Sequence, residues 1–177
     1  NLHLVERAEA KAVSAALLEG TPVGFWSQYP VAGTLPRGLT TEKAEIGIVV
    51  ADTAKASPYE TTLHLVPKAV TLGIGCRRGI DPAPRILEVL AQAAIPLGAV
   101  KALASIDLKR DEPGLLAFAQ AHGLETHFYS AQELSQELGD FPASALVSQV
   151  TGVDNVCQRA AQRAGGRVFL PKTSGGG

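Results

Sequence analysis

The feature that most constrains the fold is an alternation of strand-like and helix-like runs that begins at Ala69. The strand-like runs are AVTLGIG, AVKALASID and ETHFYS, and between them stand the helix-like runs PAPRILEVLAQAA and EPGLLAFAQAHG. Pro82 and Pro113 fall in the first turns of these helices, where proline is tolerated, and Gly123 is a typical helix stop. Such alternation favours a parallel sheet with helices on both faces. We therefore predict a three-layer α/β/α domain with a mostly parallel sheet over residues 69–177.

The end of the chain continues this pattern with three further helices and a strand. Ser130 and Glu133 form a capping box at the start of SAQELSQEL. ASALVSQV is expected to be a short helix, and DNVCQRAAQRAGG a helix with Asp154 as its N-cap. RVFLPK, residues 167–172, is expected to be the last strand.

Residues 1–68 are expected to form a separate, small α/β unit. The run LVERAEAKAVSAALLEG has the apolar spacing of an amphipathic helix and ends at Gly20. PVGFWS, EIGIVVAD and TTLHLV follow as predicted strands. The domain boundary is therefore placed between residues 68 and 69.

Composition excludes several classes of protein. A net charge of −1 gives no basic field that would favour nucleic acid. No apolar run reaches the roughly 20 residues of a membrane span, so we expect no membrane partner and a cytoplasmic protein. The two cysteines, Cys76 and Cys157, form no CxxC pair, and no protein-bound metal is predicted. Because the chain has no methionine, we interpret it as a piece of a longer protein.

Basic residues gather where the predicted parallel strands end. In an open parallel sheet, ligands bind beyond the carboxyl ends of the strands, and the loops there share one edge. The cations expected at this edge are Arg77, Arg78, Lys109, Arg110 and Lys172. They form either an anion site or an ordinary solvated rim, since loops are generally polar.

The glycines of TLGIGCRRG argue against a dinucleotide site. Gly73, Gly75 and Gly79 have the spacing GxGxxxG, one residue longer than the dinucleotide fingerprint, and Pro82 begins the next helix. No P-loop sequence is present. A nucleotide-binding domain is therefore a minor alternative.

Cys76 and Glu112 each have a chemical and a structural interpretation. The arginines beside Cys76 and a nearby helix N-terminus would activate its thiol, but no histidine is obviously aimed at it, so we favour a structural role. Glu112 starts a helix whose dipole favours the anionic carboxylate. The functional alternative is a general acid or base among cations.

Several motifs in order resemble the CbiG family of cobalamin-biosynthesis proteins. They are GIGCRRG, ASIDLKRDEPGLLAFAQ, FYSAQEL, VTGVDNVCQRAA and FLPKTSGG. Over residues 69–177 the chain resembles the CbiG C-terminal domain, which the smaller protein CobE shares. Residues 1–68 resemble the CbiG central region, which CobE-type proteins lack. The resemblance also implies that an N-terminal domain and a final strand lie outside the given sequence, so this piece need not be active alone.

The resemblance implies the activity of a cobalt-precorrin-5A hydrolase. This enzyme opens a lactone on the corrinoid ring and releases acetaldehyde to give cobalt-precorrin-5B, on the anaerobic route to vitamin B12. The substrate brings its own cobalt, so no cofactor is expected. The alternative is a non-catalytic, CobE-like module that binds or carries a corrinoid. A homodimer is left open.

Arginine and lysine suit the carboxylates on the rim of a precorrin, and lactone hydrolysis needs a base and oxyanion donors. We hypothesise that Glu112 or Asp107 is the base and that backbone N–H groups between Gly75 and Arg78 bind the oxyanion. The expected substrate-binding residues are Gly75, Cys76, Arg77, Arg78, Lys109, Thr151, Asn155 and Lys172.

Overall fold

The structure is a computed structural model that describes residues 1–139, 141 and 155–173. The chain divides into two compact units, Asn1–Lys68 with Ala91–Ala99, and Ala69–Leu90 with Val100–Gly177. The helix predicted over residues 143–150, the expected N-cap residue Asp154 and the predicted site residue Thr151 lie outside the described residues.

The first unit is built on a five-stranded sheet with the strand order β1-β5-β4-β2-β3 in the part that the structure describes. Its strands are β1 (Leu2–Leu4), β2 (Val23–Ser27), β3 (Leu39–Thr40), β4 (Ile46–Val50) and β5 (Thr61–Pro67). β1 runs antiparallel to β5, and the other pairs are parallel. The sequence predicts β2, β4 and β5, whereas the short edge strands β1 and β3 were not expected.

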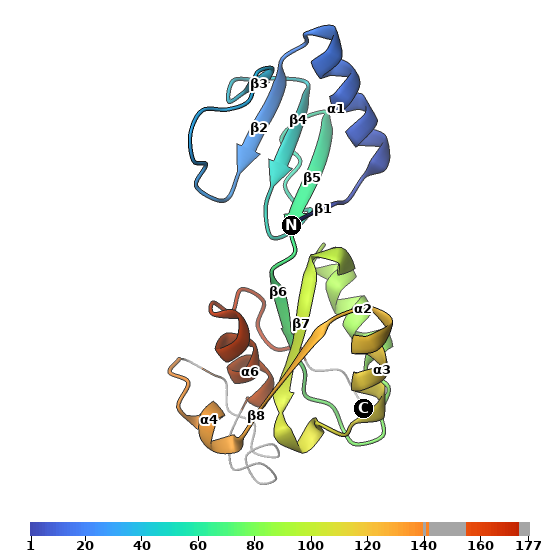
Figure 1. Ribbon diagram of the computed structural model, residues 1–177, viewed down its shortest axis with the longest axis vertical. Helices are drawn as coiled ribbons and strands as arrows, with labels where there is room; N and C mark the ends of the chain where they lie inside the picture. Colours follow the sequence, from blue (N-terminus) through green and yellow to red (C-terminus); the bar gives the residue numbers. More distant parts are fainter. Residues whose placement is uncertain (140, 142–154, 174–177) are drawn as a thin grey trace. The chain divides into compact units, whose positions relative to one another are not determined.

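Helix α1 (Arg7–Glu19) covers one face of this sheet, as its apolar spacing predicts. Val13 and Ala16 of the helix pack on Val23 and Leu63 of the sheet in one buried cluster. Gly20 ends the helix in the left-handed conformation, with φ 79°. On the first unit this helix lies beside the strands in Figure 1.

Tyr59 covers the opposite face at a place where the sheet has no side chains. Gly24 of β2 and Gly47 of β4 are direct partners in the parallel register. A Cβ atom at either glycine would collide with the Tyr59 ring. Thr62 holds the tyrosine backbone in place, because its hydroxyl donates to the Tyr59 carbonyl at 3.0 Å. The pair of glycines thus forms the seat of an aromatic ring.

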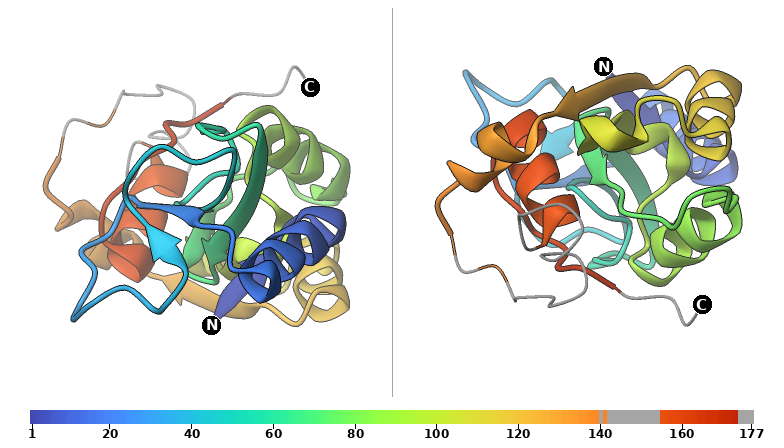
Figure 2. Two further views of the ribbon diagram at one scale, coloured as in Figure 1. Left: turned by 90° about the horizontal axis from the view of Figure 1, so that it is seen from above. Right: turned by 90° about the horizontal axis from the view of Figure 1, so that it is seen from below.

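The second unit has a parallel sheet with the order β6-β7-β8 among the described residues. The strands are β6 (Val70–Gly73), β7 (Val100–Ile106) and β8 (Glu125–Tyr129), and the helices are α2 (Ala83–Gln92), α3 (Pro113–Ala121), α4 (Ala131–Ser135) and α6 (Val156–Gly165). Helices α2 and α3 lie on one side of the strands, and α4 and α6 on the other (Figures 1 and 2). This unit confirms the three-layer α/β/α prediction.

Close packing of α6 on β6 depends on Gly73. A Cβ atom there would overlap the backbone carbonyl of Cys157, in the first turn of α6. Val156 and Ala160 of the same helix join Ala104 and Ile106 of β7 in a buried cluster. This packing brings the N-terminus of α6 to the carboxyl end of β6.

The predicted helix starts are largely correct, except that the N-cap residue of α6 is Asn155 and not Asp154. Pro113 occupies the first turn of α3, and Ser130 and Glu133 form the expected capping box at α4. Asp81 accepts a hydrogen bond from the Ala83 backbone N–H at 3.0 Å at the start of α2. The strand predicted over residues 167–172 is wrong: this segment follows α6 without strand pairing. No helix in the described part of the chain is long and apolar enough to cross a membrane.

We expect Gly47→Ala to destabilise the protein by about 1–3 kcal/mol, because the added methyl overpacks against the Tyr59 ring. Urea unfolding at neutral pH measures the change. In a Tyr59→Ala background, the same Gly47→Ala substitution should cost much less stability than it does in wild type. Equal costs of Gly47→Ala in both backgrounds would show that the ring is not the obstacle.

Candidate functional site

The carboxyl edge of the second sheet brings together most of the residues that the sequence singles out. The loop at 75–79 follows β6. The short 3-10 helix η2 (Asp107–Lys109) follows β7 and leads to Glu112, the N-cap residue of α3. Asn155 caps α6, whose first turn lies against Gly73. The prediction that these loops share one edge is correct for the segments after β6 and β7.

The 75–79 loop is anchored to the sheet where it begins. The Ile74 backbone N–H donates to the Ala104 carbonyl at 2.8 Å, and the Ser105 hydroxyl donates to the Ile74 carbonyl at 2.7 Å. Ser105 is buried, with 1% of its surface exposed. Ser105 was not among the residues predicted from the sequence, although a serine inside the apolar run ALASI is a usable signal for a buried polar contact.

Glu112 anchors the same loop where it ends. Its Oε1 accepts a hydrogen bond from the Gly79 backbone N–H at 2.5 Å, and its Oε2 accepts one from Lys109 Nζ at 3.1 Å. Only 2% of this residue is exposed. The Gly79 amide, followed by Lys109 and Arg78, holds the pKa of the Glu112 carboxyl below its usual range, against the opposing effect of burial. The carboxylate is thus ionised, and each of its oxygens has a partner.

The loop between the two anchors presents free donors. Within the part of the chain that the structure describes, the backbone N–H groups of Gly75, Cys76, Arg77 and Arg78 have no hydrogen-bond acceptor. The loop is exposed at Gly75 and from Arg77 onward. Unpaired N–H groups in such a place can bind an anion.

The cations of this edge differ in exposure and in whether an acid neutralises them. Lys109 is 16% exposed in its side chain and is neutralised by Glu112. Arg78 is 76% exposed and only reaches Asp111 at 4.0 Å, a distance at which an exposed pair is weak. Arg77, Arg110 and Lys172 are exposed and form no ion pair among the described residues. The free positive charge therefore belongs mainly to arginines.

The two cysteines are not activated. Burial raises the pKa of the Cys76 thiol, with Glu112 acting in the same direction and Lys109 against it. Burial likewise raises the pKa of Cys157, which nearby Lys172 lowers only in part. Both thiols are therefore protonated at neutral pH, which favours the structural interpretation of Cys76.

Asn155 is a structural part of the edge in the described residues. It is fully buried and adopts a left-handed backbone conformation, with φ 45°. Its side-chain amide donates to Gln158, and its carbonyl oxygen accepts from the Cys157 thiol at 3.4 Å. These contacts hold the first turn of α6, so Asn155 is placed beneath the surface that a ligand would touch.

Asp107 is the other acid of the edge. It begins η2 directly after β7 and is half-buried. Its backbone carbonyl accepts from the Arg110 N–H at 3.0 Å, while its carboxylate has no partner among the described residues. Unlike Glu112, this carboxylate is available to water.

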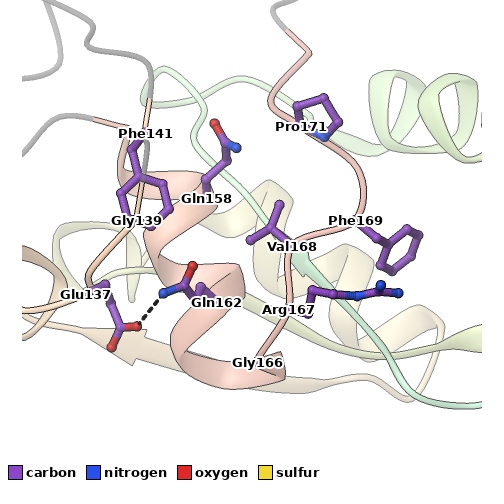
Figure 3. Close-up of a pocket in the computed structure, with 10 residues that line it drawn as sticks. All are labelled: Glu137, Gly139, Phe141, Gln158, Gln162, Gly166, Arg167, Val168, Phe169 and Pro171. Atoms are coloured by element: carbon purple, nitrogen blue, oxygen red, sulfur yellow. Dashed lines mark hydrogen bonds between the residues drawn. The ribbon is translucent and has the colours of Figure 1, made fainter.

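A pocket of about 630 Å³ lies elsewhere on the second unit, along α6 (Figure 3). Its acid, Glu137, is bound by Gln162 Nε2 at 3.3 Å and by Arg163 Nη1 at 2.9 Å. None of the site residues predicted from the sequence lines this pocket. The chain has no group of three or more His, Cys, Asp or Glu side chains that could hold a metal, in the part that the structure describes.

Both units match known sequence families. The family described as "Cobalamin synthesis G C-terminus" matches residues 70–177, and the one described as "Cobalamin biosynthesis central region" matches residues 1–67.

Curated relatives cover the two units to different extents. A protein of Salmonella typhimurium named "Cobalt-precorrin-5A hydrolase" is 30% identical over 172 residues, which are 88% of this chain and 48% of that protein. A Priestia megaterium protein of the same name is 40% identical over 98 residues, or 54% of this chain and 26% of that protein. "Protein CobE" of Sinorhizobium sp is 33% identical and covers 55% of this chain and 66% of its own. The chain thus spans about half of the Salmonella relative.

A crystal structure of CobE, "a protein from the cobalamin (vitamin B12) biosynthetic pathway", has the same fold over much of the chain. It is 34% identical with a TM-score of 0.53, and the match covers 59% of this chain and 82% of that protein. The likeness supports the arrangement described above.

We expect the contribution of Glu112 to stability to disappear in acid. Its pKa is lower in the folded chain than in the unfolded one, so the stabilisation is present above the unfolded value of about 4.3 and is lost as the pH falls through the lower folded value. Urea unfolding between neutral pH and about pH 3 should show Glu112→Gln less stable than wild type near neutrality, with a gap that narrows in acid. The exposed Glu125→Gln serves as control, with little change at any pH. A gap that stays constant with pH contradicts the ionised, anchored carboxylate.

Proposed function

Because the chain belongs to the CbiG family of cobalamin-biosynthesis proteins, we propose that it is part of a cobalt-precorrin-5A hydrolase. The observation that carries this proposal is the match to the Salmonella relative, whose printed name is that activity, across 88% of the chain. The substrate would be a cobalt-precorrin, and water would open its ring lactone with release of acetaldehyde.

The CobE-like carrier is the second candidate, since CobE resembles more than half of the chain in sequence and fold. Its sequence match covers only 55% of the chain. The family of the central region matches residues 1–67 in addition. The first unit is therefore the feature that favours the hydrolase.

The anchored loop supports binding of a ligand with several carboxylates. Arg77 and Arg78 are exposed at the carboxyl edge, and arginine pairs with a carboxylate through two parallel hydrogen bonds. Lys109, which we expected to bind substrate, has its charge committed to Glu112. We propose that the two arginines bind the corrinoid rim and that the exposed Arg110 and Lys172 add positive charge.

The same loop supports stabilisation of the tetrahedral intermediate. Water attack on the lactone carbonyl places negative charge on its oxygen, and fixed N–H donors are the usual means of stabilising it. The free N–H groups from Gly75 to Arg78 are such donors. The substrate brings its own cobalt, and we propose that no cofactor of the protein takes part.

Asp107 is the better of the two proposed bases. A general base must accept a proton from water within hydrogen-bonding reach. Asp107 is half-buried and its carboxylate has no partner among the described residues, whereas Glu112 is buried with both oxygens engaged. We propose that Asp107 activates the attacking water.

We expect Asp107→Asn in the complete protein to lower the rate of acetaldehyde release from cobalt-precorrin-5A by at least about a hundredfold, the usual range for loss of a general base. Binding of the substrate should change by less than about threefold, because the shape of the side chain is kept. Coupled detection of acetaldehyde under single-turnover conditions measures the rate. Full activity of the variant would exclude Asp107 as the base.

We expect the double variant Arg77→Ala, Arg78→Ala to weaken corrinoid binding more than about tenfold, because two charge-assisted contacts are lost. Calorimetric titration with cobyrinic acid, a corrinoid with free carboxylates, measures the affinity. Arg7→Ala, on α1 of the first unit, is the matched control and should leave it unchanged. Equal affinity of the double variant and wild type would reject the arginine site.

A further inference from the structure

The loop that carries Arg77 and Arg78 is held at both ends, and the two anchors differ in kind. At Ile74 the anchors are a strand-like backbone hydrogen bond and a serine hydroxyl of the neighbouring strand. At Gly79 the anchor is a carboxylate that comes from beyond the end of β7. Gly79 itself has a φ of 77°, a conformation that other residues rarely adopt, so the turn at this end is closely defined.

Glu112 joins three segments, one through its backbone and two through its buried side chain. Its backbone caps α3, its Oε1 binds the loop after β6, and its Oε2 binds Lys109 of η2. Next to it, a Cβ atom at Gly114 would come within 3.0 Å of the Ile80 carbonyl and of Pro82. The start of α3 therefore lies directly against the segment that leaves the loop.

This arrangement is poorly suited to proton transfer. A base needs a free lone pair that points to water, whereas both Glu112 oxygens are occupied and only 2% of the residue is exposed. A buried ion pair is also weak evidence for stability alone, because desolvation offsets much of its attraction. Fixing the position of the 75–79 loop accounts better for a buried carboxylate at this place.

We propose that Glu112 is the positioning residue of the corrinoid site: its carboxylate holds the 75–79 loop so that the free N–H groups and the two arginines face the ligand. It also keeps Lys109 neutralised, so that the ligand meets arginines at this edge. The role of Glu112 toward a corrinoid rests on the proposed function, whereas the anchoring of the loop does not.

The experiment compares Glu112→Gln with Glu112→Ala in the complete protein. The glutamine keeps an oxygen that can accept from the Gly79 N–H, and the alanine keeps none. Three quantities are measured: the exchange rate of the Gly79 amide proton by NMR, the affinity for cobyrinic acid, and the rate of acetaldehyde release from cobalt-precorrin-5A. Cobinamide, a corrinoid whose side chains are amides, is the ligand control, and Glu125→Ala is the protein control.

We expect Gly79 exchange to be slow in wild type and Glu112→Gln and at least about tenfold faster in Glu112→Ala, because only the alanine removes the acceptor. Affinity for cobyrinic acid should fall more than about tenfold in Glu112→Ala and less than about threefold in Glu112→Gln, while cobinamide binding changes little in either. Acetaldehyde release by Glu112→Gln should stay within about fivefold of wild type, since no base is lost.

Two outcomes would overturn the proposal. If Glu112→Gln lowers acetaldehyde release by a hundredfold or more with unchanged affinity, Glu112 is the base after all. If Glu112→Ala folds, exchanges Gly79 rapidly and still binds cobyrinic acid as wild type does, the loop needs no anchor. If the alanine variant does not fold, the turnover and affinity of Glu112→Gln decide between the two roles. Failure of wild type to bind cobyrinic acid or to release acetaldehyde would instead reject the proposed function, and Gly79 exchange would still test the anchor.

Discussion

The close contact between Gly73 and the Cys157 carbonyl sets the geometry of the second unit's carboxyl edge. A side chain at Gly73 would push the first turn of α6 away from β6. Ala104, Ile106, Val156 and Ala160 could then no longer close their shared core on that face of the sheet. Because α6 begins where β6 ends, the same contact places the first turn of α6 next to the start of the 75–79 loop, where a Cβ atom at Gly75 would lie 3.9 Å from Cys157 Cβ. Packing of the core and placement of the edge are therefore one constraint.

The other end of this loop is held by a charged group, the Glu112 carboxylate, and not by close packing. Glu112 stays ionised inside the protein because the Gly79 amide and Lys109 replace the water it has lost. The loop between these two supports has neither helix nor strand of its own, and yet both of its ends are fixed. Preorganised donors of this kind lose less entropy when they bind an anion than mobile ones do.

The sequence predicts the alternation of strands and helices well, because period, proline and capping signals are local. Pro113, Ser130 and Glu133 each occupy the position that their chemistry requires in the structure. Residues 167–172 have the apolar content of a strand but pair with no strand in the described part of the chain, and pairing cannot be predicted from a single segment. The sequence also predicts that Glu112 and Lys109 lie at the carboxyl edge of the second sheet. It could not show that their charges neutralise each other. That depends on which rotamer points inward and on the Gly79 amide, 33 residues away.

A local cationic edge on a chain of net charge −1 has a consequence for specificity. Without a general positive field, attraction acts only within about 8 Å at physiological salt, so a ligand must bring its carboxylates to the loop itself. Neutralising Lys109 sharpens this further, because a lysine is a point charge that tolerates many geometries, whereas an arginine prefers a planar, bidentate partner. The corrinoid proposed as ligand, a rigid ring with carboxylates on its rim, has the geometry that exposed arginines prefer. In the proposed site, the buried glutamate would lower the total attraction and leave the more selective arginine contacts.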